Sequence, residues 1–289
     1  MSEGRIASIH ARLLNKAKAR GENFNQTLMR YALERFLYRL SQLPARQDYC
    51  LKGALLFDLW FNQPHRPTHD ADFLGFGPMD IEALATTVRE ICGVAVDDGM
   101  VFNPASVVVN EIREESRYGG FRVRLLGMLG KARCTVQVDV GYGDAVTPGP
   151  QEAVYPVLLA DMPPPRLHVY PRATVVAEKL EAIVNLGMGN SRMKDYFDLC
   201  VLAREGALDA EELADAIAAT FQRRGTAIPD KLPLGLSDEF VADAVKRSQW
   251  QAFIAKNKLE ALKLDAVIDE VCRFVSHPMR LARQKLETP

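Results

Sequence analysis

The chain has 289 residues, enough to build a complete hydrophobic core in one large domain or two modest ones. Its 36 basic and 37 acidic residues give a net charge of −1, which excludes binding to nucleic acid through bulk positive charge. The start lacks the apolar core of a signal peptide, no apolar run approaches membrane-spanning length, and the five cysteines are widely spread. We therefore expect a cytoplasmic protein with reduced thiols and no membrane association.

Residues 1–44 carry apolar side chains at helical spacing and predict leading helices. Arg30 and Glu34 are four residues apart, and we expect them to pair on the outer face of a helix. Lys52-Gly53-Ala54 then opens an apolar stretch that predicts a further helix. A turn of small residues lets the backbone approach a phosphate, and the N–H groups at a helix start can donate to it. A plain structural turn is the alternative.

Two aspartates follow in a short extended segment, at Asp70 and Asp72. Alternate side chains of a strand share a face, so these carboxylates repel each other unless a cation lies between them. A third, Asp139, lies in the strand-like run 136–140, on the face opposite to its valines. Mg²⁺ or Mn²⁺ for phosphoryl or nucleotidyl transfer is commonly held by such a set. We predict a divalent metal site here, although an Asp-x-Asp pair by itself would also fit a solvated loop.

Strand-like patterns dominate from about residue 47 to 160, and one of them alternates Arg122 and Arg124 with apolar residues. With a net charge near zero, binding of RNA requires a local basic cluster. We predict one continuous basic surface leading to Asp70 and Asp72. Its candidates are Arg66, Arg122, Arg124, Lys131, Arg133, Arg192 and Lys194, the last two of which also fit a solvated helix end.

The proline-rich stretch 162–166 cannot be helical, and it predicts a rigid crossing between two lobes. Beyond Arg172 the pattern is helical nearly to the end of the chain. The sequence thus predicts an α+β fold. Residues 1–165 would form N-terminal helices plus a mixed-sheet palm like that of nucleotidyltransferases, and residues 166–289 would form a helical C-terminal lobe.

The second lobe supplies positive charge at Lys179, at the margin of the apolar stripe of a predicted helix. An ammonium there can hold triphosphate oxygens, although most helix lysines are simply exposed. Ser191 is the expected N-cap of the next helix, in which Asp195 and Asp198 share a face. Asp195 also fits stabilisation of the helix dipole, and Asp198 fits orientation of Lys179 or Lys194.

Ordered motifs extend from the leading helices into the second lobe. They are Asn23-Phe24-Asn25 with residues 30–37, Lys52-Gly53-Ala54 with Arg66-x-Thr68-x-Asp70-x-Asp72, and residues 176–182 with residues 191–199. Together these motifs resemble those of the AbiEii/AbiGii-type toxins, which are nucleotidyltransferase-like proteins of toxin–antitoxin and phage abortive-infection systems. The resemblance covers most of the chain and thins after about residue 220. Gly-Ala replaces the Gly-Ser or Gly-Gly usual in the turn, which removes a hydroxyl contact but keeps the small size.

The resemblance implies an enzyme that moves a nucleoside monophosphate from an NTP to an acceptor hydroxyl. It implies a tRNA 3′ end as the acceptor, with a protein hydroxyl as the alternative, and a neighbouring gene for an antitoxin with a winged-helix DNA-binding domain. In this hypothesis Mg²⁺ or Mn²⁺ is bound by Asp70, Asp72 and Asp139. The predicted catalytic residues are these three with Lys179, Asp195 and Asp198, and the predicted nucleotide-binding residues are Lys52, Gly53, Ala54, Arg66, Thr68 and Lys179.

Two other classes stay open: a catalytically silent nucleotide-binding protein, and an enzyme that nucleotidylates a small molecule such as an aminoglycoside. The intact set of three aspartates argues against the first, because a degenerate palm has no physical need to keep like charges together. An acidic acceptor pocket would favour the second, and a basic groove would favour RNA. A zinc pair of His65 and His69 is disfavoured, because Pro67 lies between them and prevents a shared helical face.

Overall fold

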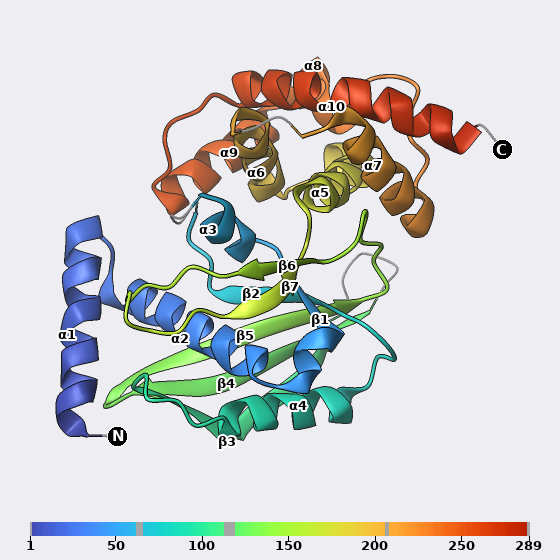
Figure 1. Cartoon of the computed structure of the whole chain (residues 1–289). Helices are drawn as coiled ribbons and strands as arrows, with labels where there is room; N and C mark the ends of the chain where they lie inside the picture. The colour runs from blue at the N-terminus through green and yellow to red at the C-terminus, as the bar shows by residue number, and fades with distance from the viewer. Residues whose placement is uncertain (1, 62–65, 113–118, 206–207, 288–289) are drawn as a thin grey trace. The chain divides into compact units, whose positions relative to one another are not determined.

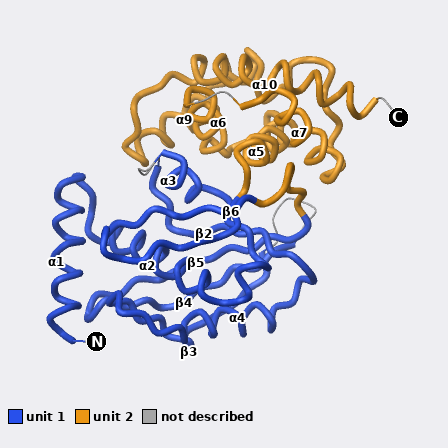
Figure 2. Tube along the Cα trace, viewed as in Figure 1, with its two compact units in different colours: residues 1–143, 151–169 blue, residues 144–150, 170–289 orange. Residues whose placement is uncertain are grey.

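The computed structural model describes residues 2–61, 66–112, 119–205 and 208–287. Figure 1 shows the order of the elements along the chain, and Figure 2 colours its two compact units. Unit 1 comprises Met1–Gly143 and Gln151–Val169, and unit 2 comprises Asp144–Pro150 and Tyr170–Pro289. Each unit has its own hydrophobic core.

Unit 1 is built on a mixed sheet, whose strands in the described part of the chain run in the order β3-β4-β5-β2-β1-β7-β6. β2 is parallel to β5 and β1 is parallel to β7, whereas the other neighbouring strands are antiparallel. The strands are β1 (Tyr49–Lys52), β2 (Asp70–Gly75), β3 (Met100–Ile112), β4 (Gly120–Leu129), β5 (Ala132–Tyr142), β6 (Gln151–Val154) and β7 (Arg166–Val169). The Asp-x-Asp strand therefore lies directly beside the strand that carries Asp139, as Figure 1 shows.

One face of this sheet forms the hydrophobic core of unit 1. Ala71 and Phe73 of β2 and Val138 of β5 point to it and are at most 3% exposed. The ring of Phe36 meets that of Phe102 in β3 edge to face, at 5.9 Å, and this places α2 on the same side. Strand alternation leaves the aspartates of β2 and β5 on the opposite face. The helices of unit 1 are α1 (Glu3–Arg20), α2 (Phe24–Ser41), α3 (Leu55–Phe61) and α4 (Ile81–Gly93), with the 3-10 helix η1 (Pro44–Asp48).

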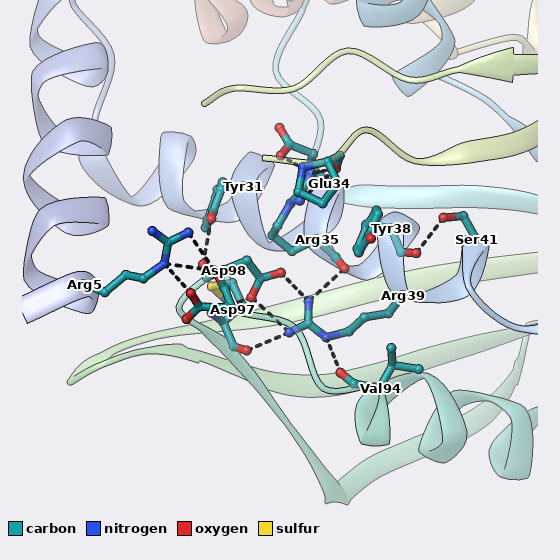
Figure 3. Close-up of polar contacts among 12 residues, drawn as sticks. Arg5, Tyr31, Glu34, Arg35, Tyr38, Arg39, Ser41, Val94, Asp97 and Asp98 are labelled. Atoms are coloured by element: carbon teal, nitrogen blue, oxygen red, sulfur yellow. Dashed lines mark hydrogen bonds and ion pairs between the residues drawn. The ribbon is translucent and has the colours of Figure 1, made fainter. Parts of the chain in front are cut away.

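α2 carries charged side chains into this core, and Figure 3 shows their polar contacts. Arg39, which is 2% exposed, donates to both carboxylate oxygens of Asp98, at 2.7 and 3.0 Å. The hydroxyl of Tyr31 donates to the backbone oxygen of Asp98 at 2.7 Å. A buried charge is tolerated only when it is paired and hydrogen-bonded, and this network meets both conditions.

The predicted pairing of Arg30 with Glu34 on the outer face of a helix is wrong. Glu34 is 3% exposed, and its carboxylate pairs with Arg35 at 2.6 Å and accepts a hydrogen bond from the backbone amide of Leu158. Arg30 instead contacts Asp58 of α3 at 3.4 Å. Burial raises the pKa of the Glu34 carboxyl to about 7, although Arg35 and the Leu158 amide act to lower it.

Unit 2 is helical, as predicted for the C-terminal part of the chain. The buried residues within its helices recur at helical spacing. Its helices are α5 (Arg172–Leu186), α6 (Met193–Arg204), α7 (Ala210–Arg224), α8 (Asp238–Ala242), α9 (Ala244–Asn257) and α10 (Leu264–Glu287), with the 3-10 helices η2 (Gly187–Gly189) and η3 (Leu234–Leu236). α7 packs against α5 and α10, which makes it the centre of this core. Among the described helices of the whole chain, none has the length and apolar character needed to cross a membrane.

The chain passes from unit 1 to unit 2 after β7 rather than at the proline-rich stretch. Cys50 and Leu51 of β1 pair with His168 and Val169 of β7, so the strand that follows the proline-rich stretch belongs to the sheet of unit 1. The segment Asp144–Pro150, between β5 and β6, groups with the helical unit. Unit 1 therefore extends beyond residue 165, where sequence analysis puts the boundary.

Candidate active site

A tight turn joins β1 to α3. Gly53 has a φ of 76°, in the left-handed region that favours glycine. A Cβ at this position would lie 2.0 Å from the Oδ2 atom of Asp72. The Asp72 carboxylate therefore lies directly against the backbone of the turn, and both the conformation and the contact require a residue without a side chain. Ala54, which follows, accepts a hydrogen bond from the backbone amide of Phe57 in the first turn of α3.

Asp70, Asp72 and Asp139 lie together on the face of the sheet opposite the core. Asp72 and Asp139 are register partners on the parallel strands β2 and β5. One carboxylate oxygen from each of the three lies within 4.8 Å of the others, and all three residues are half-buried. Three carboxylates at this separation repel each other, and they fit the oxygen ligands that Mg²⁺ or Mn²⁺ prefers. Of the two histidines considered for zinc, His65 lies outside the described residues and His69 is exposed.

Two neighbouring side chains hold these carboxylates. The hydroxyl of Thr68 donates to Oδ1 of Asp70 at 2.7 Å. The guanidinium of Arg122 in β4 donates to both oxygens of Asp139, from Nε at 2.9 Å and from Nη2 at 2.6 Å. The hydrogen bond to Asp139 raises the pKa of Arg122, and the charges of the three aspartates add to this shift. Arg122, which sequence analysis assigns to RNA contact, thus binds a carboxylate of the candidate metal site.

Lys52 also lies on the carboxylate face. Lys52 lies on β1, where it is the register partner of Asp72 of β2. Its Nζ atom lies 3.7 Å from the place that a Cβ would occupy at Gly141, two residues after Asp139 on β5. The ammonium therefore extends across β2 towards β5. Arg66, which is half-buried, lies in the segment that leads into β2.

Lys179 of unit 2 is bound by both predicted aspartates. Its Nζ atom lies 2.7 Å from Oδ1 of Asp195 and 2.8 Å from Oδ2 of Asp198. Both aspartates are completely buried, and the side chain of Lys179 is 12% exposed. Burial acts to raise the pKa of Asp195, but Lys179 and Arg192 outweigh it, so the pKa of this carboxyl lies below its usual range. The two aspartates therefore orient Lys179 together.

The start of α6 differs from the prediction. The helix begins at Met193, and Ser191 is exposed and does not cap it. Instead the side-chain oxygen of Asn190 accepts a hydrogen bond from the backbone amide of Arg192 at 2.8 Å, and Arg192 pairs with Asp195 at 2.8 Å. Asp195 in the first turn thus does more than stabilise the helix dipole, because two cationic side chains bind it.

Unit 2 contains a second ionic cluster that was not predicted from the sequence, centred on Arg224 at the end of α7. Its guanidinium contacts Asp144 at 2.9 Å, Glu178 at 3.5 Å and Glu181 at 2.8 Å. The two glutamates flank Lys179 on α5, so this cluster fixes the helix that presents it. A sequence signal existed, because Glu178 and Glu181 are three residues apart and interrupt the apolar stripe.

The other strand residues proposed for RNA contact lie at different distances from the three carboxylates. Arg124 donates from Nε to Gln137 at 3.2 Å and stays exposed. Lys131 and Arg133 are exposed at the hairpin between β4 and β5. Arg133 precedes Asp139 by six residues, about 20 Å along a strand. Arg124 therefore lies nearer the carboxylates, and whether the basic residues form one surface stays a prediction.

A family model described as the nucleotidyl transferase AbiEii toxin of type IV toxin–antitoxin systems matches residues 35–270, more than half of the chain. A comparison with curated protein sequences gives no significant match. Among solved structures, a candidate nucleotidyltransferase from H. pylori is 17% identical with a TM-score of 0.48, and the match covers 90% of this chain and 95% of that one. JHP933 from Helicobacter pylori is 16% identical with a TM-score of 0.49, over 91% of this chain and 93% of that one. The family match confirms the resemblance carried by the motifs: this chain belongs to the AbiEii nucleotidyl transferase toxin family of type IV toxin–antitoxin systems.

Proposed function

We propose that this nucleotidyltransferase moves a nucleoside monophosphate from an NTP to the 3′ end of a tRNA, with Mg²⁺ or Mn²⁺ held by Asp70, Asp72 and Asp139. The observation that supports a metal-dependent transfer is the convergence of these three carboxylates within 4.8 Å, on one face of the sheet. The family supports the general activity. The tRNA acceptor is the part of the proposal that the resemblance suggests.

The proposed step is an in-line displacement at the α-phosphate of the NTP. The acceptor hydroxyl forms a new P–O bond, the bond between the α- and β-phosphates breaks, and pyrophosphate leaves with the bonding electron pair. The proton of the hydroxyl passes to the carboxylate of Asp139. A bound divalent cation neutralises charge on the phosphates and lowers the pKa of the attacking hydroxyl.

The nucleotide would lie beside the turn at Gly53. At Gly53 the Asp72 carboxylate occupies the place of a Cβ, so a phosphate bound by the backbone of this turn would lie next to the candidate metal site. Lys52 supplies a cation on the same face as the aspartates. Arg66 and Thr68 precede β2, and Thr68 fixes Asp70. Lys179, oriented by its two aspartates, is proposed to bind the triphosphate and to stabilise the charge that develops during transfer.

Membership of a type IV toxin–antitoxin family implies an antitoxin partner. We expect this partner to be a protein with a winged-helix DNA-binding domain that is encoded by the neighbouring gene. A tRNA acceptor and an NTP donor place the proposed reaction in the cytoplasm.

The proposal is tested by incubating the purified protein with each α-labelled NTP, total tRNA and MgCl₂, and separating the products on a denaturing gel. We expect one NTP to label tRNA, and we expect the label to be lost with EDTA and with Asp72→Asn. Treatment of the tRNA with periodate before the reaction should also abolish labelling, since periodate destroys the 2′,3′-diol at the 3′ end of the tRNA.

Other outcomes distinguish the remaining classes. Labelling of a protein band with no labelling of RNA would indicate that the acceptor is a protein hydroxyl and not a tRNA. Label on an added aminoglycoside would indicate a small-molecule acceptor. Tight NTP binding without transfer to any of these acceptors would contradict the proposal and favour a silent nucleotide-binding protein.

A further inference from the structure

A row of charged side chains crosses the sheet at the level of Asp139. Register pairing sets Arg122 of β4 beside Asp139 of β5, Asp139 beside Asp72 of β2, and Asp72 beside Lys52 of β1. Register partners share a face, so all four side chains lie on the carboxylate face. From β4 to β1 the row therefore consists of one cation, two anions and one cation. Asp70 adds a third anion, two residues before Asp72 on β2.

Arg122 binds Asp139 through two hydrogen bonds. Both oxygens of Asp139 accept a hydrogen bond from its guanidinium, at 2.9 and 2.6 Å, in the parallel two-bond geometry that is specific to arginine. The side chain of Arg122 is 35% exposed and that of Asp139 is 16% exposed, so solvent screens this pair only in part. A divalent cation at the carboxylates would have to share Asp139 with a positive charge already bound to it.

The neighbouring arginine shows that this arrangement is specific. Arg124 lies two residues along β4 on the same face, and its register partner is the neutral Gln137, to which it donates a single hydrogen bond. One of the two arginines is therefore matched to a carboxylate of the cluster, and the other is matched to an amide.

We propose that Arg122 is a positioning residue and the internal counter-ion of the cluster: it holds Asp139 beside Asp72 in the absence of metal and competes with the cation for that carboxylate. This role rests on the proposed metal-dependent function. It predicts that the wild-type protein has a metal affinity lower than its three carboxylates would give by themselves. It also predicts that Asp139 needs Arg122 in order to keep its position during transfer.

The test compares wild-type protein with Arg122→Gln and Arg122→Lys by titration with Mn²⁺, followed by the electron paramagnetic resonance signal of the unbound ion, without nucleotide. Removing one positive charge from contact with the cluster should tighten Mn²⁺ binding about tenfold in Arg122→Gln. Arg122→Lys, which retains the charge, should bind Mn²⁺ within about threefold of wild type. Mn²⁺ should also raise the unfolding temperature of Arg122→Gln more than that of the wild type.

Arg124→Gln is the matched control, because it removes the same charge from the same face of the same strand. Its Mn²⁺ affinity should change clearly less than that of Arg122→Gln, and equal changes would show a general charge effect and overturn the proposal. In transfer assays, Arg122→Gln should lower kcat while the KM for NTP stays near the wild-type value. A role in binding the nucleotide would raise KM instead.

Two failures can be told apart. If the wild type binds Mn²⁺ and Asp72→Asn weakens that binding, but Arg122→Gln binds Mn²⁺ no more tightly than wild type, the counter-ion role is wrong and the metal site stands. If wild-type protein shows no Mn²⁺ binding that depends on Asp72, the proposed metal site is wrong, and the role of Arg122 is overturned with it.

Discussion

Two ionic clusters, one around Asp70, Asp72 and Asp139 and the other around Lys179, use the same kinds of residues in opposite ways. In unit 1, Asp70, Asp72 and Asp139 are half-buried carboxylates on strands, so negative charge is concentrated where water and ions have access. In unit 2, Lys179 lies between two completely buried aspartates, so a cation is enclosed by its own counter-charges. The first cluster is therefore the one that we propose to receive a cation, whereas the second holds the side chain of Lys179 in place.

Replacing one aspartate in each cluster should therefore affect stability differently, with a loss expected only in unit 2. Asp72→Asn relieves repulsion in unit 1, so the unfolding temperature should be unchanged or higher than that of the wild type. Transfer should fall by at least about 1,000-fold, since a ligand of the metal is lost. Thermal unfolding and the labelling assay measure the two quantities on one preparation. A variant that unfolds at a lower temperature, or that retains activity, would contradict the account of unit 1.

Asp198→Asn makes the matching change in unit 2. Here the substitution removes a counter-charge from the enclosed Lys179, and breaking a buried ion pair costs about 3–5 kcal/mol. Urea unfolding should show a loss near the lower end of this range, because Asp195 still binds Lys179. An unchanged unfolding midpoint would show that the ion pairs of Lys179 with Asp195 and Asp198 do not stabilise unit 2, and the contrast between the two units would fail.

The turn beside the first cluster offers a sharper comparison between two glycines. Gly53→Ala places a Cβ against Asp72, and we expect about a 100-fold loss of transfer, equivalent to about 2.7 kcal/mol. Gly77 also has a positive φ, of 92°, but nothing lies within 4 Å of its Cβ position. Gly77→Ala should therefore cost only about 1 kcal/mol of stability from backbone strain and leave transfer intact. Equal effects of the two variants on activity would remove the special role of the turn.

The smallest expected effect concerns the buried carboxyl of Glu34, whose pKa is raised to about 7 by burial. Because the folded protein binds this proton more tightly than the unfolded chain, the resulting stability is present below about pH 4.5 and is lost as the pH rises through about 7. The free energy of unfolding should fall between pH 5 and pH 8 by about 2–3 kcal/mol more in wild type than in Glu34→Gln, as measured in urea. Glu90→Gln, at an exposed glutamate of α4, is the control and should keep the wild-type pH dependence.

The architecture around the first cluster was accessible from local patterns. The Asp-x-Asp alternation and the valines around Asp139 predict two strands with their carboxylates turned away from the core, and the structure pairs these strands. The contact of Arg122 with Asp139 could also have been found. A two-residue hairpin turn sets Leu129 opposite Ala132, and counting back along both strands sets Arg122 opposite Asp139.

Contacts that depend on tertiary packing were not accessible in this way. Whether Asp195 or Asp198 binds Lys179 depends on how α5 and α6 pack, and their helical periodicity fits either answer. The burial of Glu34 depends on the amide of Leu158, which is far along the chain. Helix periodicity reports the spacing of side chains within one helix, and it does not report which distant segment covers them.

The most direct test of the central claim is the location of the metal. Crystals grown with MnCl₂ and a non-hydrolysable NTP should show anomalous scattering from manganese between the carboxylates of Asp70 and Asp72. The triphosphate should lie beside Gly53. A manganese peak elsewhere, with the nucleotide bound away from these aspartates, would contradict the account.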